Sequence, residues 1–330
     1  MERKPEELLE LCRGKKIFIQ THNFPDPDAI GASFGLQQLL QHFGIESQLC
    51  HEGQIDKLSA KKMLNLCGIT MYPYADLQST MKEEDMIILV DCQKNNGNTT
   101  DLIGDELAVI DHHPTFAEVQ YQYSDLFLTG ACCSIVADYY RILGVTPSAE
   151  TATALLYGLR MDTLNLSRGV TAFDVEMYAY LFTYADSELL SDLESNNMEF
   201  SDLQAYGTAI NHVQVYGKVG FSYIDYDCPD ALIGILSDFL LSLQEVEIAV
   251  IYAQRDAGYK LSVRSEMDDV HAGELVHDSV EGLGNGGGHA VMAGGFIQKE
   301  ALAPMGADVF RTIQNLFITI LQRDCPKALE

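Results

Sequence analysis

Residues 16–31 read KIFIQTHNFPDPDAIG, which combines a short β-prone run, a polar loop and the start of a helical pattern. Lys16–Thr21 is short and β-prone, and the apolar spacing from Ala29 to Phe43 favours a helix. Two prolines stiffen the loop between them. This stretch therefore predicts a strand, a loop and a helix in succession, the unit from which α/β folds are built.

The same alternation continues through the first half of the chain. Met86–Val90 and Leu107–Ile110 are apolar runs with the length of buried strands, and helical patterns follow at Ser134–Leu143 and Glu150–Leu159. Strands that alternate with helices indicate a doubly wound, mainly parallel sheet. We therefore predict an α/β fold for this part of the chain.

A change of pattern predicts a domain boundary near residue 195. A helical stretch at Thr171–Tyr184 precedes the acidic run Asp186–Asp202, and a connecting helix is expected from Leu203. We expect a catalytic domain over 1–195 and a smaller α/β domain over 196–330, across a cleft from the first. Its expected elements are strands at Val246–Ala253 and Tyr259–Arg264 and a helix at His271–Glu281, followed by the glycine-rich run Gly282–Gly295, which contains a glycine-rich loop at Gly282–Gly287.

Composition limits the classes of ligand. The formal charge of −27 on 330 residues disfavours a broad basic surface for long nucleic acids, so any phosphate substrate should be small. The N-terminal residues lack the apolar core of a signal peptide, and no run of about 18 apolar residues predicts a membrane span. We expect a cytoplasmic protein with reduced cysteines, because the eight cysteines form no C-x-x-C pair.

Polar residues follow each of the three predicted strands. His22, Asp26 and Asp28 follow the first, Asp91 the second, and Asp111-His112-His113 the third. In parallel sheets ligands bind at the carboxyl ends of the strands, and mixed imidazole and carboxylate groups are typical of metal sites. Taken singly, several of these residues also suit purely structural roles: Asp26 and Asp28 fit a helix cap and a turn, and Asp162 fits a helix end.

Considered together, these residues resemble the four motifs of the DHH phosphoesterases. The matching residues are His22-x-x-Pro25-Asp26-x-Asp28-Ala29-x-Gly31, then Asp91, then Asp111-His112-His113, then Gly158-x-x-x-Asp162-Thr163. Gly286-Gly287-Gly288-His289 followed by Ala293-Gly294 resembles the signature of the DHH-associated C-terminal domain. Within this family the chain looks like the subgroup of nano-RNases and 3′-phosphoadenosine 5′-phosphate phosphatases.

The resemblance implies a centre of two divalent cations. One ion would be bound by His22, Asp26 and Asp91, and the other by Asp28, Asp91, His112 and Asp162. Such ligands suit Mn²⁺, with Co²⁺ and Mg²⁺ as alternatives. His113 would contact the scissile phosphate or assist the leaving group, and Asp111 would orient an imidazole.

The glycine-rich run is the candidate for substrate binding in the second domain. Consecutive glycines at Gly286, Gly287 and Gly288 favour close approach of backbone amides to an anion, and His289 and Arg264 would assist. The run also satisfies G-x-G-x-x-G, but it follows a predicted helix and not a strand, so a dinucleotide fingerprint is not indicated. A structural ion pair is the alternative role for Arg264.

The leading functional hypothesis is hydrolysis of very short oligoribonucleotides or of a nucleoside 3′,5′-bisphosphate. The alternatives are an exopolyphosphatase or pyrophosphatase, a phosphodiesterase of signalling dinucleotides, and a non-catalytic nucleotide sensor. The complete set of metal-ligand positions argues against the sensor. A homodimer is compatible with the sequence.

Overall fold

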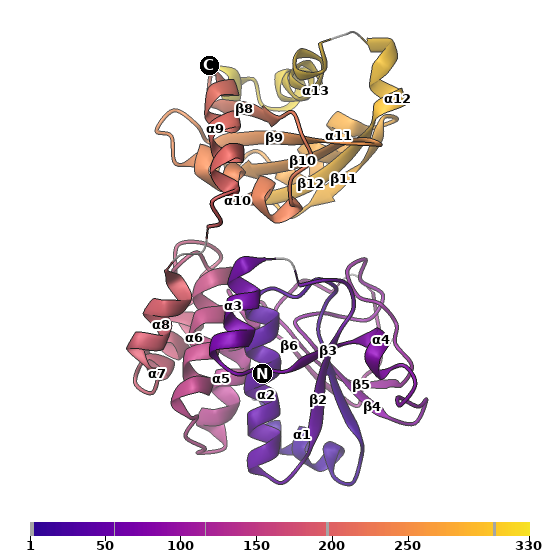
Figure 1. Cartoon of the computed structure of the whole chain (residues 1–330), viewed down its shortest axis with the longest axis vertical. Coiled ribbons are helices and arrows are strands. Elements are labelled where there is room, and N and C mark those ends of the chain that lie inside the picture. The colour runs from indigo at the N-terminus through magenta and orange to yellow at the C-terminus, as the bar shows by residue number, and fades with distance from the viewer. Residues whose placement is uncertain (1–2, 56, 116, 196–197, 306–307) are drawn as a thin grey trace. The chain divides into compact units, whose positions relative to one another are not determined.

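The computed structural model describes residues 3–55, 57–115, 117–195, 198–305 and 308–330. Two compact units divide the chain, Met1–Asn197 and Met198–Glu330 (Figure 1). The domain boundary predicted near residue 195 adjoins residues 196 and 197, which lie outside the described residues.

The first unit contains a six-stranded sheet in the order β3-β2-β1-β4-β5-β6. Every neighbouring pair in this order is parallel, which confirms the predicted mainly parallel sheet. The central position of β1 and β4 places the carboxyl ends of β1, β4 and β5 side by side. The strands are β1 Ile17–Gln20, β2 Ser47–His51, β3 Met71–Pro73, β4 Met86–Val90, β5 Asp105–Asp111 and β6 Tyr123–Leu126.

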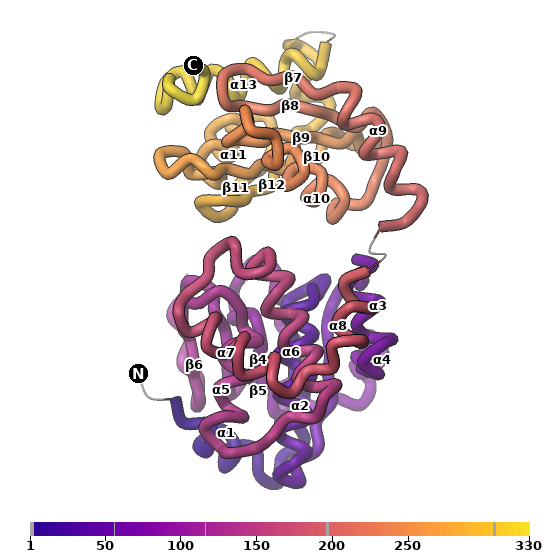
Figure 2. The backbone as a smooth tube through the Cα atoms, turned by 90° about the vertical axis from the view of Figure 1, so that its left-hand side faces the viewer, coloured from indigo at the N-terminus to yellow at the C-terminus, as the bar shows by residue number. Residues whose placement is uncertain are grey.

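Helices pack on this sheet in layers. Helix α2 contacts α5 and α6, and these two contact α7, which lies further from the sheet in Figure 1 and towards the viewer in Figure 2. Alternate strand residues divide the core: Ile17 and Ile19 of β1 face the helical layer, whereas Phe18 belongs to a smaller core that includes Leu77 of α4. The helices are α1 Pro5–Cys12, α2 Pro27–His42, α3 Leu58–Leu66, α4 Tyr74–Leu77, α5 Cys132–Ile142, α6 Ala149–Asp162, α7 Ala172–Phe182 and α8 Ser187–Glu194.

Glycines allow α2 and α6 to approach closely. A Cβ atom at Gly31 would lie 2.8 Å from the Ala154 carbonyl oxygen, and one at Gly158 would lie 2.7 Å from the Pro27 carbonyl oxygen. Real side chains do not tolerate such distances, so only glycine fits at these two contacts. The close packing brings the C-terminal end of α6, with Asp162, to the N-terminal end of α2, with Asp28.

The second unit is a smaller α/β domain with its own sheet, in the order β11-β12-β10-β9-β8-β7. Only β8 and β9 are parallel among its described pairs. Its elements are α9 Asp202–His212, β7 Gln214–Tyr216, β8 Val219–Ile224, α10 Asp230–Leu241, β9 Ile248–Arg255, β10 Gly258–Ser265, α11 Ala272–Val280, β11 Gly284–Gly288, β12 Met292–Gln298, α12 Lys299–Leu302 and α13 Val309–Asp324, with 3₁₀ turns at Ala303–Met305 and Pro326–Leu329.

The glycine-rich loop predicted at Gly282–Gly287 is wrong from Gly284 onwards. Gly284–Gly288 forms the edge strand β11, and it pairs with β12 in an antiparallel hairpin. Gly286 allows β11 to pack closely on α11, because a Cβ atom at this position would lie 2.4 Å from Val276 Cγ1. Turn propensity suggested a loop, but tertiary pairing with β12 decided for a strand.

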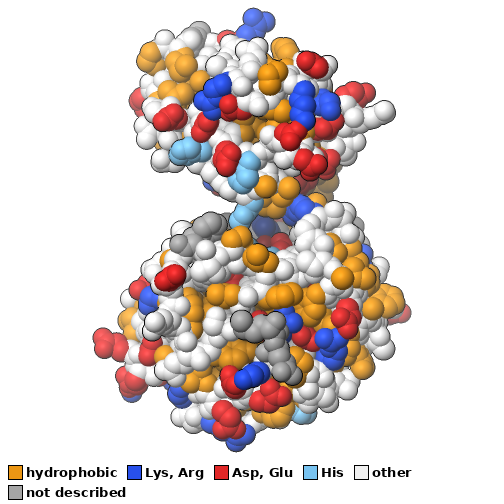
Figure 3. All heavy atoms as spheres, turned by 180° about the vertical axis from the view of Figure 1, so that it is seen from behind, with side chains coloured by type: hydrophobic (Ala, Val, Ile, Leu, Met, Phe, Trp, Pro, Cys, Tyr) orange, Lys and Arg blue, Asp and Glu red, His pale blue; other side chains and the backbone are white. Residues whose placement is uncertain are grey.

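The surface agrees with the acidic composition. Figure 3 shows acidic side chains scattered over one face of both units, interspersed with basic and hydrophobic ones.

No described helix combines the length and the apolar character that are needed to span a lipid bilayer. All eight cysteines are buried and none forms a disulfide, as expected.

Candidate metal centre

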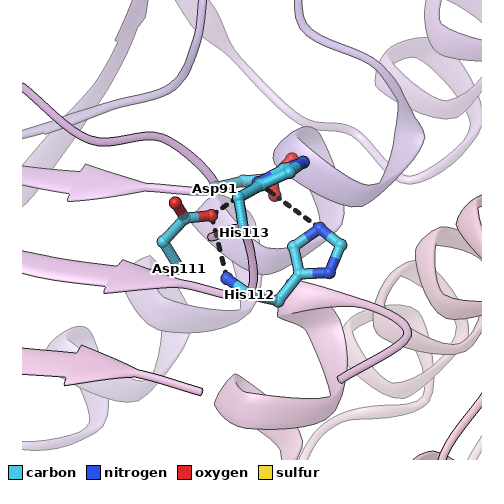
Figure 4. Close-up of side chains that lie close together, drawn as sticks. All are labelled: Asp91, Asp111, His112 and His113. Atoms are coloured by element: carbon cyan, nitrogen blue, oxygen red, sulfur yellow. Dashed lines mark hydrogen bonds and ion pairs between the residues drawn. The ribbon is translucent and has the colours of Figure 1, made fainter. Parts of the chain in front are cut away.

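The three polar clusters that follow β1, β4 and β5 meet at the carboxyl edge of the parallel sheet. Figure 4 shows Asp91 from the end of β4 beside Asp111, His112 and His113 from the end of β5. The loop after β1 adds His22 and Asp26, which form a second possible metal-ligand group with Asp91. A third such group among the described residues consists of Asp28, His112 and Asp162. The sheet topology thus assembles residues that are far apart in the sequence.

Two imidazoles present the same atom to the carboxylates. His22 donates from Nδ1 to the Asn23 carbonyl oxygen at 2.7 Å, and His112 donates from Nδ1 to the Thr129 carbonyl oxygen at 3.0 Å. This leaves Nε2 of each ring facing Asp91, at 3.6 Å for His22 and 3.2 Å for His112. Fixing one ring nitrogen with a backbone carbonyl is the usual arrangement behind a metal-binding histidine.

Asp91 lies at the middle of the cluster in a strained backbone conformation. Its φ angle is 60°, a left-handed value that is uncommon for a residue other than glycine. The side chain is buried, and its Oδ1 atom accepts no hydrogen bond of good geometry from the residues that the structure describes. Buried oxygens without such a partner are rare, and strain of this kind concentrates at functional sites.

The two aspartates of the first loop have different environments. Asp26 caps α2 by accepting hydrogen bonds from the amides of Asp28 and Ala29. The carboxylate of Asp28 is buried, and its two oxygens accept the amides of Cys132 and Cys133 at the N-terminus of α5. The cap predicted as an alternative role is therefore present at Asp26, whose Oδ1 atom also lies 4.0 Å from His22 Nε2.

The carboxylates repel one another in the absence of a cation. Burial, together with the charges of Asp91 and Asp162, raises the pKa of Asp28 well above its ordinary value. Burial and the charge of Asp26 raise the pKa of Asp162 to about 6. Burial disfavours a charged His112, but the interaction with Asp91 outweighs it and raises the pKa of that imidazole well above its usual range. The centre needs positive charge.

Asp111 orients its neighbours. One oxygen lies 2.8 Å from His113 Nδ1 and also accepts the amide of His112, and the other accepts a hydrogen bond from Gln93. Burial works against ionisation, but the hydrogen bond from His113 lowers the pKa of Asp111. The same pair raises the pKa of His113 to about 9, against the effect of burial. In the metal-free protein the contact with Asp111 therefore favours the charged form of His113.

The donor set fits divalent cations. His22, Asp26 and Asp91 form one group whose ligand atoms lie within 4.8 Å of one another, and Asp28, His112 and Asp162 form a second. Asp91 also groups with His112, so it lies against both. Imidazole nitrogens and several carboxylate oxygens, one of them buried and without a good hydrogen bond from the described residues, match the needs of Mn²⁺ or Mg²⁺.

The substrate-binding candidates of the second unit lie on β10 and β11, the two strands that flank β12, and in the turn between β11 and β12. Arg264 of β10 is opposite Met292 of β12, next to the hairpin turn that carries His289. Its guanidinium is directed to Asp238 of α10, with Nε 2.6 Å from Oδ1. The structural ion pair considered as the alternative for Arg264 is thus present. Among the glycines, Gly287 has no atom within 4 Å of its Cβ position, so packing does not explain it.

Sequence reasoning missed several residues of the first unit's site. Gln93 donates to Asp111 and to the His113 carbonyl oxygen, and Lys57 Nζ lies 4.0 Å from Asp26 Oδ2. Neither belongs to a motif, and only the position of Gln93 two residues after Asp91 hinted at a role. The amides of Cys132 and Cys133 carry no side-chain signal, so a sequence pattern cannot reveal them.

Comparison with known proteins identifies both units. A family model described as "DHH family, N-terminal domain" matches residues 16–159, and one described as "DHHA1 domain" matches residues 216–315. An uncharacterised protein of Methanocaldococcus jannaschii is 26% identical over 91% of this chain, which spans 60% of that relative's length. A probable manganese-dependent inorganic pyrophosphatase of Streptococcus mutans is 24% identical over 89% of this chain and 99% of its own length.

Solved structures show the same fold. An exopolyphosphatase-related protein from Bacteroides fragilis has a TM-score of 0.79 at 18% identity, with 98% of this chain and 96% of that chain covered. RecJ from Thermus thermophilus in complex with Mn²⁺ has a TM-score of 0.56 at 17% identity, with 96% of this chain and 54% of that chain covered. Residues 16–159 therefore form a domain of the DHH family's N-terminal type, and a DHHA1 domain follows at residues 216–315.

Proposed function

We propose that the protein is a two-metal-ion phosphoesterase that hydrolyses very short oligoribonucleotides or nucleoside 3′,5′-bisphosphates. The observation that carries the proposal is the position of Asp91, whose carboxylate lies between the Nε2 atoms of His22 and His112. A carboxylate with an imidazole on each side can serve two cations at once. Asp26 would complete one ligand set, and Asp28 with Asp162 the other.

Two divalent ions in such a site would supply a nucleophile at neutral pH and neutralise charge that develops on the phosphoryl group. Mn²⁺ is the proposed ion, which the ligand types support, as does the Mn²⁺ bound in RecJ from Thermus thermophilus. Co²⁺ and Mg²⁺ are the alternatives to be compared with it.

His113 is the proposed catalytic imidazole. Its hydrogen bond with Asp111 fixes the ring through Nδ1 and favours the charged form by raising its pKa. A charged imidazole can contact an oxygen of the scissile phosphate and give a proton to the leaving oxygen. Asp111, which Gln93 holds in turn, would act by keeping His113 in this orientation.

The preference for small substrates follows from charge. The formal charge of −27 opposes the approach of a long polyanion, so attraction must come from the metal centre and a few local groups. Lys57 beside Asp26 is one such group in the first unit. In the second unit we propose Arg264, His289 and the backbone of Gly286–Gly288 as the residues that bind the remainder of a short substrate.

The test is a direct comparison of substrates. Purified protein with Mn²⁺ would be incubated with an RNA dinucleotide, an RNA of about 24 nucleotides, 3′-phosphoadenosine 5′-phosphate, pyrophosphate and polyphosphate, and the products separated by anion-exchange chromatography. We expect turnover of the dinucleotide or the bisphosphate. Absence of both activities, with rapid cleavage of an inorganic substrate, would contradict the proposed substrate class.

Inorganic pyrophosphate is the second candidate, because the relative from Streptococcus mutans that carries that name matches along nearly its whole length. A pyrophosphatase needs several Lys and Arg residues around a small, highly charged substrate.

A signalling dinucleotide would contact the same residues as an RNA dinucleotide, so it belongs in the same substrate panel.

A further inference from the structure

Asp174, on the first turn of α7, is a fully buried carboxylate that the reaction chemistry does not use. Its Oδ2 atom accepts the amide of Thr171 at 2.8 Å, which closes a capping box at the start of α7. Burial disfavours its ionisation, but hydrogen bonds led by that of Ser134 outweigh burial and lower the pKa of Asp174. The carboxylate is therefore ionised and well satisfied.

Its contacts extend beyond the cap of its own helix. The same Oδ2 atom accepts the Thr129 hydroxyl at 2.7 Å and the Gly130 amide at 2.8 Å, while Oδ1 accepts the Ser134 hydroxyl at 2.7 Å. Thr129 and Gly130 lead into α5 and Ser134 lies in its first turn, about 40 residues earlier in the chain. A carboxylate that only capped α7 would need none of these three hydrogen bonds.

The backbone at Gly130 packs closely against Thr163 as well as against Asp174. A Cβ atom at Gly130 would lie 2.9 Å from Asp174 Oδ2 and 2.7 Å from Thr163 Cγ2, so no side chain fits between this backbone and the two residues. Thr163 directly follows the proposed ligand Asp162. The segment therefore has no room to shift towards these two neighbours.

The same segment also contacts two proposed metal ligands. The Thr129 carbonyl oxygen accepts the Nδ1 proton of His112. The amides of Cys132 and Cys133 donate to the carboxylate of Asp28 at 2.7 and 2.9 Å. One short stretch of backbone therefore sets the orientation of an imidazole and of a carboxylate that belong to the same proposed ion site.

From this chain of contacts we infer that Asp174 is a positioning residue of the metal centre. It fixes Thr129–Cys133, and through that segment it holds His112 and Asp28 in the geometry that one ion needs. Because Asp174 acts through Thr129–Cys133, its effect is transmitted by backbone. The inference rests on the proposed metal centre and extends it by a residue outside the family motifs.

The test is Asp174→Asn in the full chain, with direct measurement of Mn²⁺ binding to the metal-free protein by calorimetry and without substrate. Asparagine has nearly the shape of aspartate, but its NH₂ group would face hydrogen-bond donors from which it cannot accept a hydrogen bond. Removing an outer partner of a metal ligand weakens affinity about 10-fold to 100-fold, and we expect about a 10-fold loss here for one ion. Saturating Mn²⁺ should restore most of kcat, because the catalytic groups are intact.

Asp186→Ala is the matched control, because alanine cannot cap a helix. Asp186 caps α8 in the same unit by accepting the amides of Glu188 and Leu189, and it has no contact with Thr129–Cys133 in the described structure. We expect this variant to lose helix-cap stability while its Mn²⁺ affinity stays unchanged. A simple loss of stability would affect both variants alike, whereas a positioning role separates them.

A folded Asp174→Asn variant with a Mn²⁺ dissociation constant within about twofold of the parent would overturn the inference, leaving Asp174 as a helix cap. If that variant does not fold, Thr129→Val provides the test, because it removes the hydroxyl that contacts Asp174 and keeps the carbonyl oxygen that contacts His112. Weaker Mn²⁺ binding by Thr129→Val would support the inference, and unchanged binding would overturn it. Failure of the parent protein itself to bind Mn²⁺ would overturn the metal centre, and this inference with it.

Discussion

Asp91 shows at the scale of one residue how a strained, buried carboxylate can determine the chemistry of the centre. Its left-handed backbone places both oxygens among the imidazoles of His22 and His112. Such strain persists only where the surrounding structure enforces it. The loss of this one side chain should therefore affect both proposed ions.

Asp91→Asn should reduce kcat/KM by about a thousandfold or more, because a neutral amide removes the ligand shared by two ions that together contribute several kcal/mol to the transition state. Metal analysis should show the loss of at least one ion. Asp105→Asn, at the exposed start of the neighbouring strand β5, is the control and should retain both. Normal activity with full metal content in Asp91→Asn would refute the bridging role.

Asp162 allows a test by pH in the metal-free protein. Its pKa is raised from 3.8 to about 6, so the folded state binds that proton more tightly than the unfolded state does. Stability from this group is therefore complete below about pH 4 and lost as the pH rises through about 6. Asp162→Asn should raise the free energy of unfolding above pH 6 and have little effect near pH 4, as measured by urea denaturation.

The same Asp162→Asn variant should gain less stability from Mn²⁺ than the parent, because it lacks one ligand of an ion that binds only the folded state. The two effects have opposite signs, which separates ligand loss from general damage. A metal-free variant that is less stable than the parent at about pH 8 would contradict the repulsion inferred for this carboxylate.

At the scale of elements, the contact of α11 with β11 explains part of the glycine-rich run. A Cβ atom at Gly273 of α11 would lie 2.3 Å from the carbonyl oxygen of Gly288, a backbone atom that cannot move aside cheaply. Gly273→Ala should lower the free energy of unfolding by about 1–3 kcal/mol, although alanine is the better helix former. Thermal or urea unfolding measures this loss.

Gly287→Ala is the counterpart, since no atom lies within 4 Å of its Cβ position. Folding should tolerate it, but if the backbone of β11 binds an anion, the methyl group should raise KM for a dinucleotide and leave its kcat largely unchanged. A Gly287→Ala variant with the stability and KM of the parent would show that this strand is not part of the substrate site.

At the scale of the whole molecule, the charge of −27 predicts a steep dependence on substrate length. Catalytic efficiency should be highest for RNAs of about two to four nucleotides and fall for longer strands, because each further phosphate meets an acidic surface. A series of 5′-labelled RNAs at fixed ionic strength measures this. Equal kcat/KM for a dinucleotide and a long RNA would contradict it.

Substitutions of Arg264 and His289 test how much the second unit contributes to the preference for short RNA substrates. His289→Ala and Arg264→Ala should each raise KM for a dinucleotide more than they affect a small generic phosphodiester. Asp238→Asn is the control for Arg264, because it breaks the same ion pair but keeps the guanidinium. If Arg264→Ala and Asp238→Asn change KM equally, the arginine has only a structural role.

The sequence by itself determined the parallel sheet of the first unit and the candidate residues of its site. Apolar runs such as Met86–Val90 and the polar residues that follow them are local signals, because strand periodicity and ligand chemistry are both written in consecutive residues. The order of β1, β4 and β5 then follows from the rules of doubly wound sheets, and it brings His22, Asp91 and His112 to one edge.

Only the tertiary structure decided what surrounds those residues. The strand at Gly284–Gly288 forms because β12 and α11 pack against a run whose own propensity favours a loop. The Thr129 carbonyl behind His112 and the Cys132 amide on Asp28 are backbone groups, which every sequence contains and none distinguishes. Their role depends on long-range packing, such as the close contact at Gly158, and a pattern in consecutive residues does not encode it.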